Sequence, residues 1–155
     1  MLSNQIIIYD LEMKTYQQLW QSITPLYEAG EAQAIVRTVL DVKYGMTLTD
    51  IICGKVNELS ADEGKKLEEI VCRLQKGEPV QYVLGQADFA GRTFHVEPGV
   101  LIPRADTEIL VEKALAWMKP GARVLDIGTG SGAIAVSLAK LGRQAQVTAV
   151  DVSDR

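Results

Sequence analysis

The feature that most constrains this chain is the stretch 124–134, where an apolar run is interrupted by three alternating glycines and then resumes. Val124, Leu125 and Ile127 suit a strand that is buried on both faces. The glycines allow positive φ values and let the backbone lie directly against a ligand, because no Cβ is in the way. The pattern predicts a strand, a tight cofactor-binding loop and a helix. The glycines of this loop are Gly128, Gly130 and Gly132.

A second strand follows this helix and ends on a carboxylate. Apolar residues continue at helical spacing as far as Leu141, and the run 146–150 then has the composition of a strand before Asp151. The whole segment is typical of a βαβ unit. Asp151 stands at the end of the second strand, where a carboxylate can accept hydrogen bonds from both hydroxyls of a ribose.

Composition and charge narrow the class of protein. The 155 residues are 47% hydrophobic, which is enough for a packed core, and the formal net charge of −4 gives no overall field that would attract nucleic acid. We expect no membrane span, since no apolar run reaches about 18 residues, no secretory signal and a cytoplasmic location. The single histidine, His95, and the two cysteines cannot assemble a metal cluster. We expect His95 to be structural, and Cys53 and Cys72 to be reduced core thiols.

Helical periodicity predicts an all-helical segment over residues 13–77. The first helix is expected to run from Thr15 to near Gly30, and the next begins immediately. Glycine at position 45 is typical of a helix C-terminus. Capping signals start the later helices, among them a capping box in which Ser60 and Glu63 satisfy each other's backbone ends.

The next segments connect this helical part to the glycine loop. Strand-like stretches around Ala90–Arg92 predict a β-hairpin. A helix is predicted after Arg104. Capping explains the acidic residues of its first turn, Asp106 and Glu108. It does not explain Arg104, because a cation is unfavourable at the N-terminus of a helix. We expect this helix to bury Ile109, Leu110, Ala114, Leu115 and Trp117.

The residues alone leave two ligand classes open for the loop. Gly128, Gly130 and Ala133 satisfy the dinucleotide pattern G-x-G-x-x-G/A, in which a helix N-terminus receives a pyrophosphate. Asp126, two residues before the first glycine, would place an anion near those phosphates. A cofactor with a positive sulfonium tolerates this carboxylate better, and either nucleoside cofactor would use Asp151.

Several segments of the chain form a pattern together with the glycine loop. They are Pro79–Gly85, Phe89, Phe94, Val100–Glu108 and Asp126–Gly132. With these segments, the chain resembles the bacterial release-factor glutamine N5-methyltransferases, the PrmC/HemK family, from Met13 to the last residue. The glycine loop alone indicates only a class I methyltransferase, whereas the Ile-Pro-Arg-x-Asp-Thr-Glu stretch before it narrows the resemblance to this family.

The resemblance implies an enzyme that uses S-adenosylmethionine to methylate the glutamine side chain in the Gly-Gly-Gln loop of peptide-chain release factors. The helical segment would help to dock the release factor, with no direct contact to nucleic acid. Asp151 would hold the ribose of the cofactor. The residues that would line its methionine end are Gly128, Thr129, Gly130, Ser131 and Gly132.

We therefore expect an all-α N-terminal domain, a β-hairpin linker and the start of an α/β, Rossmann-like class I methyltransferase domain. The expected bounds are an extension of poor order at 1–12, the helical domain at 13–77, the linker at 78–103 and the incomplete methyltransferase domain at 104–155.

One motif of the family does not occur here. The family holds the substrate amide with an Asn-Pro-Pro-Tyr motif after a later strand, and this chain lacks the motif. Two parallel strands also cannot cover their own apolar faces. We expect a truncated chain, inactive alone, whose catalytic residues would follow Arg155. The alternatives are a non-catalytic protein-binding module and a fragment of an NAD-dependent oxidoreductase.

Overall fold

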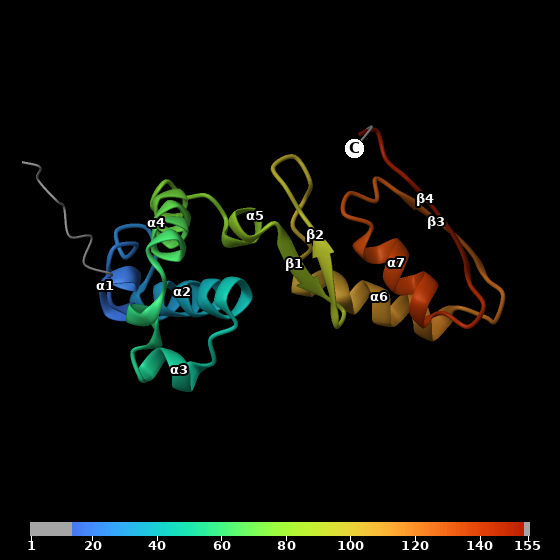
Figure 1. Ribbon diagram of the computed structural model, residues 1–155. Helices are drawn as coiled ribbons and strands as arrows, with labels where there is room; N and C mark the ends of the chain where they lie inside the picture. Colours follow the sequence, from blue (N-terminus) through green and yellow to red (C-terminus); the bar gives the residue numbers. More distant parts are fainter. Residues whose placement is uncertain (1–13, 154–155) are drawn as a thin grey trace, which may run out of the picture. The chain divides into compact units, whose positions relative to one another are not determined.

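The computed structural model describes residues 14–153, and contacts divide the chain into two compact units between Val83 and Leu84. The first unit is helical, and the second combines a hairpin with an α/β segment (Figure 1). The extension expected at residues 1–12 lies outside the described residues.

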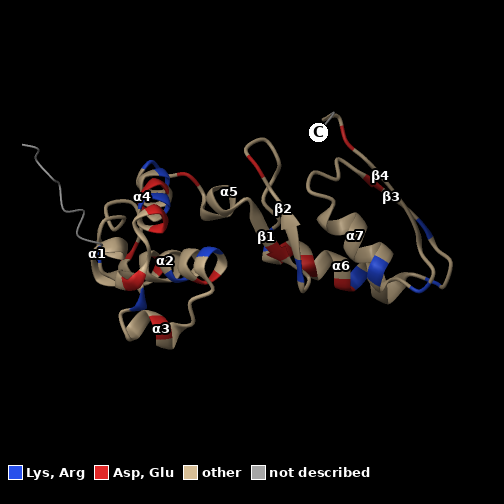
Figure 2. Ribbon diagram, in the orientation of Figure 1, with Lys and Arg blue, Asp and Glu red and all other residues tan. Residues whose placement is uncertain are grey.

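The helical unit is built from short and medium helices around an apolar core. Its fully buried side chains come from α1, α2 and α4 among others, and include Leu19, Leu40 and Leu74. Basic and acidic residues alternate along the outer side of α4, so this helix presents no surface of a single sign (Figure 2). The elements are α1 (Tyr16–Gln21), α2 (Ala29–Tyr44), α3 (Leu48–Ile52), the 3₁₀ helix η1 (Lys55–Glu58), α4 (Ala61–Gln75) and α5 (Val80–Leu84), which reaches the boundary with the second unit.

The predicted helix ends of this unit are confirmed where a local cap sets them. Ser60 and Glu63 form the expected capping box, in which the Ser60 side chain accepts from the Glu63 N–H. Gly45 ends α2 in the left-handed conformation, with φ of 62°. A side-chain cap such as that of Ser60 stabilises a helix by about 1 kcal/mol, so Ser60 defines the start of α4, while the left-handed Gly45 defines the end of α2.

The first helix is shorter than predicted. It ends at Gln21, and Gly30 lies inside α2. Pro25 lacks an N–H and disfavours helical backbone at Thr24, so a continuous helix cannot pass this point. The Thr24 hydroxyl instead donates to the carbonyl of Gln21 at 2.8 Å, which closes the turn after α1.

The two cysteines are exposed free thiols, so the prediction that they belong to the core was wrong. In α4 the buried positions are Leu67, Val71 and Leu74. Cys72 is one residue beyond Val71, which rotates it by about 100° away from this buried stripe. Cys53 stands at the C-terminal cap of α3.

The second unit contains two small sheets. Strands β1 and β2 form the predicted antiparallel hairpin, whereas β3 and β4 pair in parallel from Arg123 opposite Gln146 to Ile127 opposite Val150. The elements are β1 (Gln86–Phe89), β2 (Arg92–His95), α6 (Ala105–Trp117), β3 (Arg123–Ile127), α7 (Ala133–Leu141) and β4 (Gln146–Val150). The core cluster that joins them contains Phe89, Phe94, Val111, Ala133 and Leu138.

Burial in this unit differs from the prediction for β3. Val124 packs against the core cluster, but Leu125 and Ile127 are 59% and 76% exposed. Alternate residues of a strand point to opposite faces, so one face of the β3–β4 sheet is covered and the other is open. Strand β3 is therefore not buried on both faces.

Burial of α6 also differs from the prediction. Val111 is the buried residue of this helix, and Ala114 and Leu115 pack partly against the core cluster. Ile109, Leu110 and Trp117 are exposed. Apolar residues surround most of α6, so the sequence does not show which side faces the core.

Candidate cofactor-binding site

The glycine loop joins β3 to α7 and has the backbone geometry that its sequence predicts. The φ angles of Gly128, Gly130 and Gly132 are 75°, 55° and 75°. A Cβ would strain the backbone in this left-handed region, whatever space surrounds it. A Cβ built on Gly128 or Gly130 would also meet no atom within 4 Å, so both glycines border open space. Their backbone is therefore open to a ligand.

Backbone hydrogen bonds tie the loop to the end of β4. The N–H groups of Gly128 and Thr129 both donate to the Val150 carbonyl, at 2.8 and 3.1 Å. The Gly132 N–H donates to the Thr129 carbonyl at 2.9 Å, which closes the turn into α7. The loop is thus a fixed turn whose shape depends on β4.

Two carboxylates complete this arrangement. Asp126 accepts a hydrogen bond from the Thr129 hydroxyl at 2.7 Å, and Asp151 accepts one from the Gly130 N–H at 2.8 Å. Hydrogen bonds from the Ser153 N–H, and next from the Gly130 N–H, hold the pKa of Asp151 below its ordinary value. The loop therefore lies between two acidic groups.

The loop borders a cavity of about 120 Å³. Small-molecule sites usually measure about 300–1,000 Å³, so this cavity holds only part of a nucleoside cofactor. It lies in the second unit, and its lining is apolar apart from Arg104, two threonines and Ser131. The lining residues are Phe89, Leu101, Ile102, Pro103, Arg104, Thr107, Gly128, Thr129, Gly130, Ser131, Ala133 and Ile134.

The structure brings most of the predicted site residues together at this cavity. Residues 128–131 line it, while Gly132 and Asp151 do not. Gly132 instead starts α7, and Asp151 contacts the loop through Gly130. Sequence reasoning did not place Phe89, residues 101–104 or Thr107 at the site, although Arg104 was marked as a cation that capping did not explain.

The donors of the loop fit a sulfonium cofactor better than a pyrophosphate. A pyrophosphate at a helix N-terminus needs free backbone N–H groups, whereas those of Gly130 and Gly132 are already used within the structure. The neighbouring carboxylate of Asp126 would repel phosphates and attract a positive charge. The residues present therefore fit S-adenosylmethionine.

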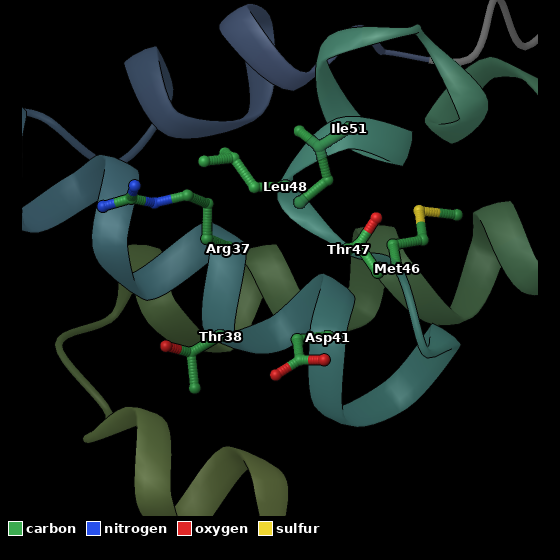
Figure 3. Close-up of a pocket in the computed structure, with 7 residues that line it drawn as sticks. All are labelled: Arg37, Thr38, Asp41, Met46, Thr47, Leu48 and Ile51. Carbon is green, nitrogen blue, oxygen red and sulfur yellow. The ribbon is translucent and has the colours of Figure 1, made fainter.

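A larger hollow of about 270 Å³ lies in the helical unit, beside α2 and α3 (Figure 3). Arg37 and Asp41 bring opposite charges to it from α2. Its hydroxyls donate elsewhere, Thr38 to the Ala34 carbonyl at 3.0 Å and Thr47 to Asp50 at 2.7 Å. Both hydroxyls are thus used in local hydrogen bonds.

Residues 14–153 contain no group of three or more His, Cys, Asp or Glu side chains placed to hold a metal ion. Within the same range, each helix is too short or too polar to cross a membrane. His95 lies exposed at the end of β2.

The helical segment and the α/β segment of the chain each match a family model of a methyltransferase. Residues 17–85 match the PrmC N-terminal domain, and residues 106–155 match the family model of the ribosomal protein L11 methyltransferase, PrmA. A release factor glutamine methyltransferase of Bacteroides thetaiotaomicron is 45% identical over 86% of this chain and 48% of its own length. The protein of the same name from Geobacter sulfurreducens is 42% identical over 83% of this chain and 46% of its own length.

A third relative gives the same result over a shorter range. The release factor glutamine methyltransferase of Koribacter versatilis is 50% identical over 62% of this chain and 35% of its own length. The chain therefore spans about half the length, or less, of these curated relatives.

Proposed function

Since the chain belongs to the release factor glutamine methyltransferase family, we propose that it binds S-adenosylmethionine at the loop 128–132. The observation that carries this proposal is the glycine loop itself. Its backbone is open at Gly128 and Gly130, it borders a cavity, and Asp151 fixes it. S-adenosylmethionine supplies an electrophilic methyl group bonded to a positive sulfur.

Each residue of the site has a distinct proposed task. The backbone of residues 128–131 lies against the methionine end of the cofactor. Asp151 accepts hydrogen bonds from the ribose hydroxyls, because a carboxylate has about four acceptor positions and the hydrogen bonds from the Gly130 and Ser153 N–H groups do not use them all. Asp126 holds the Thr129 hydroxyl and adds negative charge near the sulfonium.

We propose that the methyl acceptor is the glutamine side chain of the Gly-Gly-Gln motif in peptide-chain release factors. The nitrogen of an amide is a poor nucleophile because its lone pair is delocalised into the carbonyl. Transfer therefore needs groups that hold the N–H atoms and align the nitrogen with the methyl carbon. The Asn-Pro-Pro-Tyr motif that would do this is not among the 155 residues, so we propose that they bind the methyl donor without completing the transfer.

The open face of the β3–β4 sheet supports a methyltransferase domain with more strands than these two. Parallel sheets are normally covered on both faces, whereas Leu125 and Ile127 are exposed here. We propose that further elements of a class I methyltransferase fold cover this face. The helical unit would contact the release factor.

A transfer assay with labelled S-adenosylmethionine and a purified release factor tests this function. We expect no labelled release factor with the 155 residues alone, and labelling of the glutamine when the chain is extended to a protein that includes Asn-Pro-Pro-Tyr. Labelling by the 155 residues alone would contradict the proposed need for this motif. An extended protein that folds but leaves the glutamine unmodified would contradict the proposed reaction.

A further inference from the structure

Glu108 does not cap the helix on which it lies. It belongs to the first turn of α6, where the sequence suggests simple capping, but α6 has no side-chain cap at Arg104. Instead the Glu108 Oε1 atom accepts a hydrogen bond from the backbone N–H of Ala90, at 2.8 Å and in a partly buried position. Its task therefore concerns the β1–β2 hairpin.

Ala90 has a strained backbone conformation. It has a φ of 48° and is followed by Gly91 with a φ of 70°, so both central residues of the hairpin turn are left-handed. Tight hairpins favour this geometry but place Asn, Asp or Gly at the first position, because a Cβ is disfavoured there. Side chains hold Ala90 from both sides, since its carbonyl accepts from Arg92 at 3.1 Å and its N–H donates to Glu108.

The residue before this turn forms part of the cofactor cavity. Phe89 is 1% exposed, belongs to the core cluster with Val111 and Ala133, and also lines the cavity beside the glycine loop. Its ring meets that of Phe94 edge to face, with centroids 6.2 Å apart. The hydrogen bond from Ala90 to Glu108 thus fixes the backbone directly next to a residue of the cavity wall.

We propose that Glu108 is a positioning residue that holds Phe89 in the wall of the cofactor cavity through the Ala90 N–H. The expected effect on binding rests on the proposed function, which is that S-adenosylmethionine binds at this cavity. The position of Phe89 can be measured without any ligand. Glu108 touches neither the cavity nor the glycine loop in the described contacts, so its effect on binding would pass through the hairpin.

The test compares four variants of the full chain. Glu108→Ala removes the acceptor, whereas Glu108→Gln keeps a carbonyl oxygen at the same position. Glu112→Ala is the matched control, because it removes an exposed carboxylate one turn later on α6. Ala90→Gly with Glu108→Ala relieves the left-handed turn and so reduces its need for the hydrogen bond.

Two measurements apply to each variant. Nuclear Overhauser effects (NOEs) between the Phe89 ring and the methyl groups of Val111 and Ala133, with amide exchange at Ala90, report the position of the hairpin. Calorimetry reports the affinity for S-adenosylmethionine. For Glu108→Ala we expect faster exchange at Ala90, weaker effects from Phe89 and affinity reduced about tenfold, as for loss of one charge-assisted hydrogen bond. Glu108→Gln should recover most of the slow exchange, the NOEs and the affinity. The Ala90→Gly double variant should recover most of the NOEs and of the affinity, whereas the amide of its residue 90 still lacks the Glu108 acceptor and should exchange fast.

The outcomes separate this inference from the proposed function. Unchanged exchange at Ala90 and unchanged NOEs from Phe89 in Glu108→Ala would overturn the role of Glu108, whatever the affinity. Equal losses of the Phe89 NOEs and of affinity in Glu108→Ala and in the double variant would overturn it too, because they would show a general weakening of α6. If the parent chain binds no S-adenosylmethionine, the proposed function fails, and the exchange and NOE measurements still decide the role of Glu108.

Discussion

The Asp151 carboxylate accepts a hydrogen bond from the backbone N–H of Gly130, with 2.8 Å between Oδ2 and N. The two residues lie 21 positions apart in the sequence, one just after β4 and the other in the loop after β3. Asp151, the residue predicted to bind the ribose, is therefore also an anchor of the glycine loop. Binding of the ribose and order in the loop are expected to depend on the same side chain.

Replacement of this carboxylate should weaken cofactor binding. Asp151→Ala removes the acceptor for Gly130 and the predicted acceptor for the ribose, so we expect affinity for S-adenosylmethionine to fall by about tenfold or more, the effect of losing at least one charge-assisted hydrogen bond. Calorimetry measures this change. Asp62→Ala, an exposed carboxylate of α4, is the control and should leave affinity unchanged. Equal affinities of the two variants would show that Asp151 does not contact the ligand.

The order of the loop should depend on pH only in the acid range. Hydrogen bonds from Ser153 and Gly130 lower the pKa of Asp151, so its carboxylate contributes stability above the pKa of the unfolded chain. That contribution is lost as the pH falls through the lower, folded pKa. The Gly130 amide signal should therefore stay constant from pH 7 down to about 5 and shift below about 4. A shift centred near neutral pH would contradict this assignment.

The capping box of α4 should contribute measurably to stability. The Ser60 side chain accepts from the Glu63 N–H, so Ser60→Ala leaves an N-terminal amide of α4 without its partner. We expect the free energy of unfolding of the helical unit to fall by about 1 kcal/mol in urea titrations. Thr49→Ala, at an exposed position of α3, serves as the control. A loss no larger than that of the control would show that the cap is unimportant here.

Two glycines should respond in opposite ways to alanine. A Cβ at Gly142 would lie 2.6 Å from the Leu138 carbonyl oxygen, so Gly142→Ala must displace the end of α7 and should cost about 1–3 kcal/mol. A Cβ at Gly30 would meet nothing within 4 Å, and this residue lies in α2. Gly30→Ala should therefore stabilise the chain by about 0.4–1 kcal/mol. Thermal unfolding compares both, and the same sign for the two changes would contradict the geometry.

Features set by neighbouring residues could be predicted from the sequence. The Ser60–Glu63 cap and the left-handed Gly45 each depend on a few adjacent side chains and backbone angles. The positive φ values of the glycines between β3 and α7 could be predicted from the glycines themselves. The hairpin strands could be predicted from their local pattern and their turn. The family-specific stretch before α6 also lies where the cavity forms, because Pro103, Arg104 and Thr107 line it.

Features set by distant contacts could not be predicted. Leu125 is as apolar as Val124, and only the packing of the core cluster, which includes residues of the hairpin, α6 and α7, against one face of the sheet decides that Val124 is covered. Glu108 has the sequence context of a capping residue, and its partner Ala90 lies 18 positions earlier. The early end of α1 is different, because Pro25 is a local signal against a continuous helix although the apolar periodicity continues past it.

The ligand class of the glycine loop can be decided by titration of the chain with S-adenosylmethionine and, separately, with NAD, with the amide signals of residues 128–131 followed by nuclear magnetic resonance. We expect S-adenosylmethionine to shift the signals of these residues, NAD to leave them unchanged, and Asp151→Ala to weaken the response. Shifts of the loop signals by NAD at lower concentration than by S-adenosylmethionine, or no shift of the loop with either compound, would contradict the proposed binding of S-adenosylmethionine.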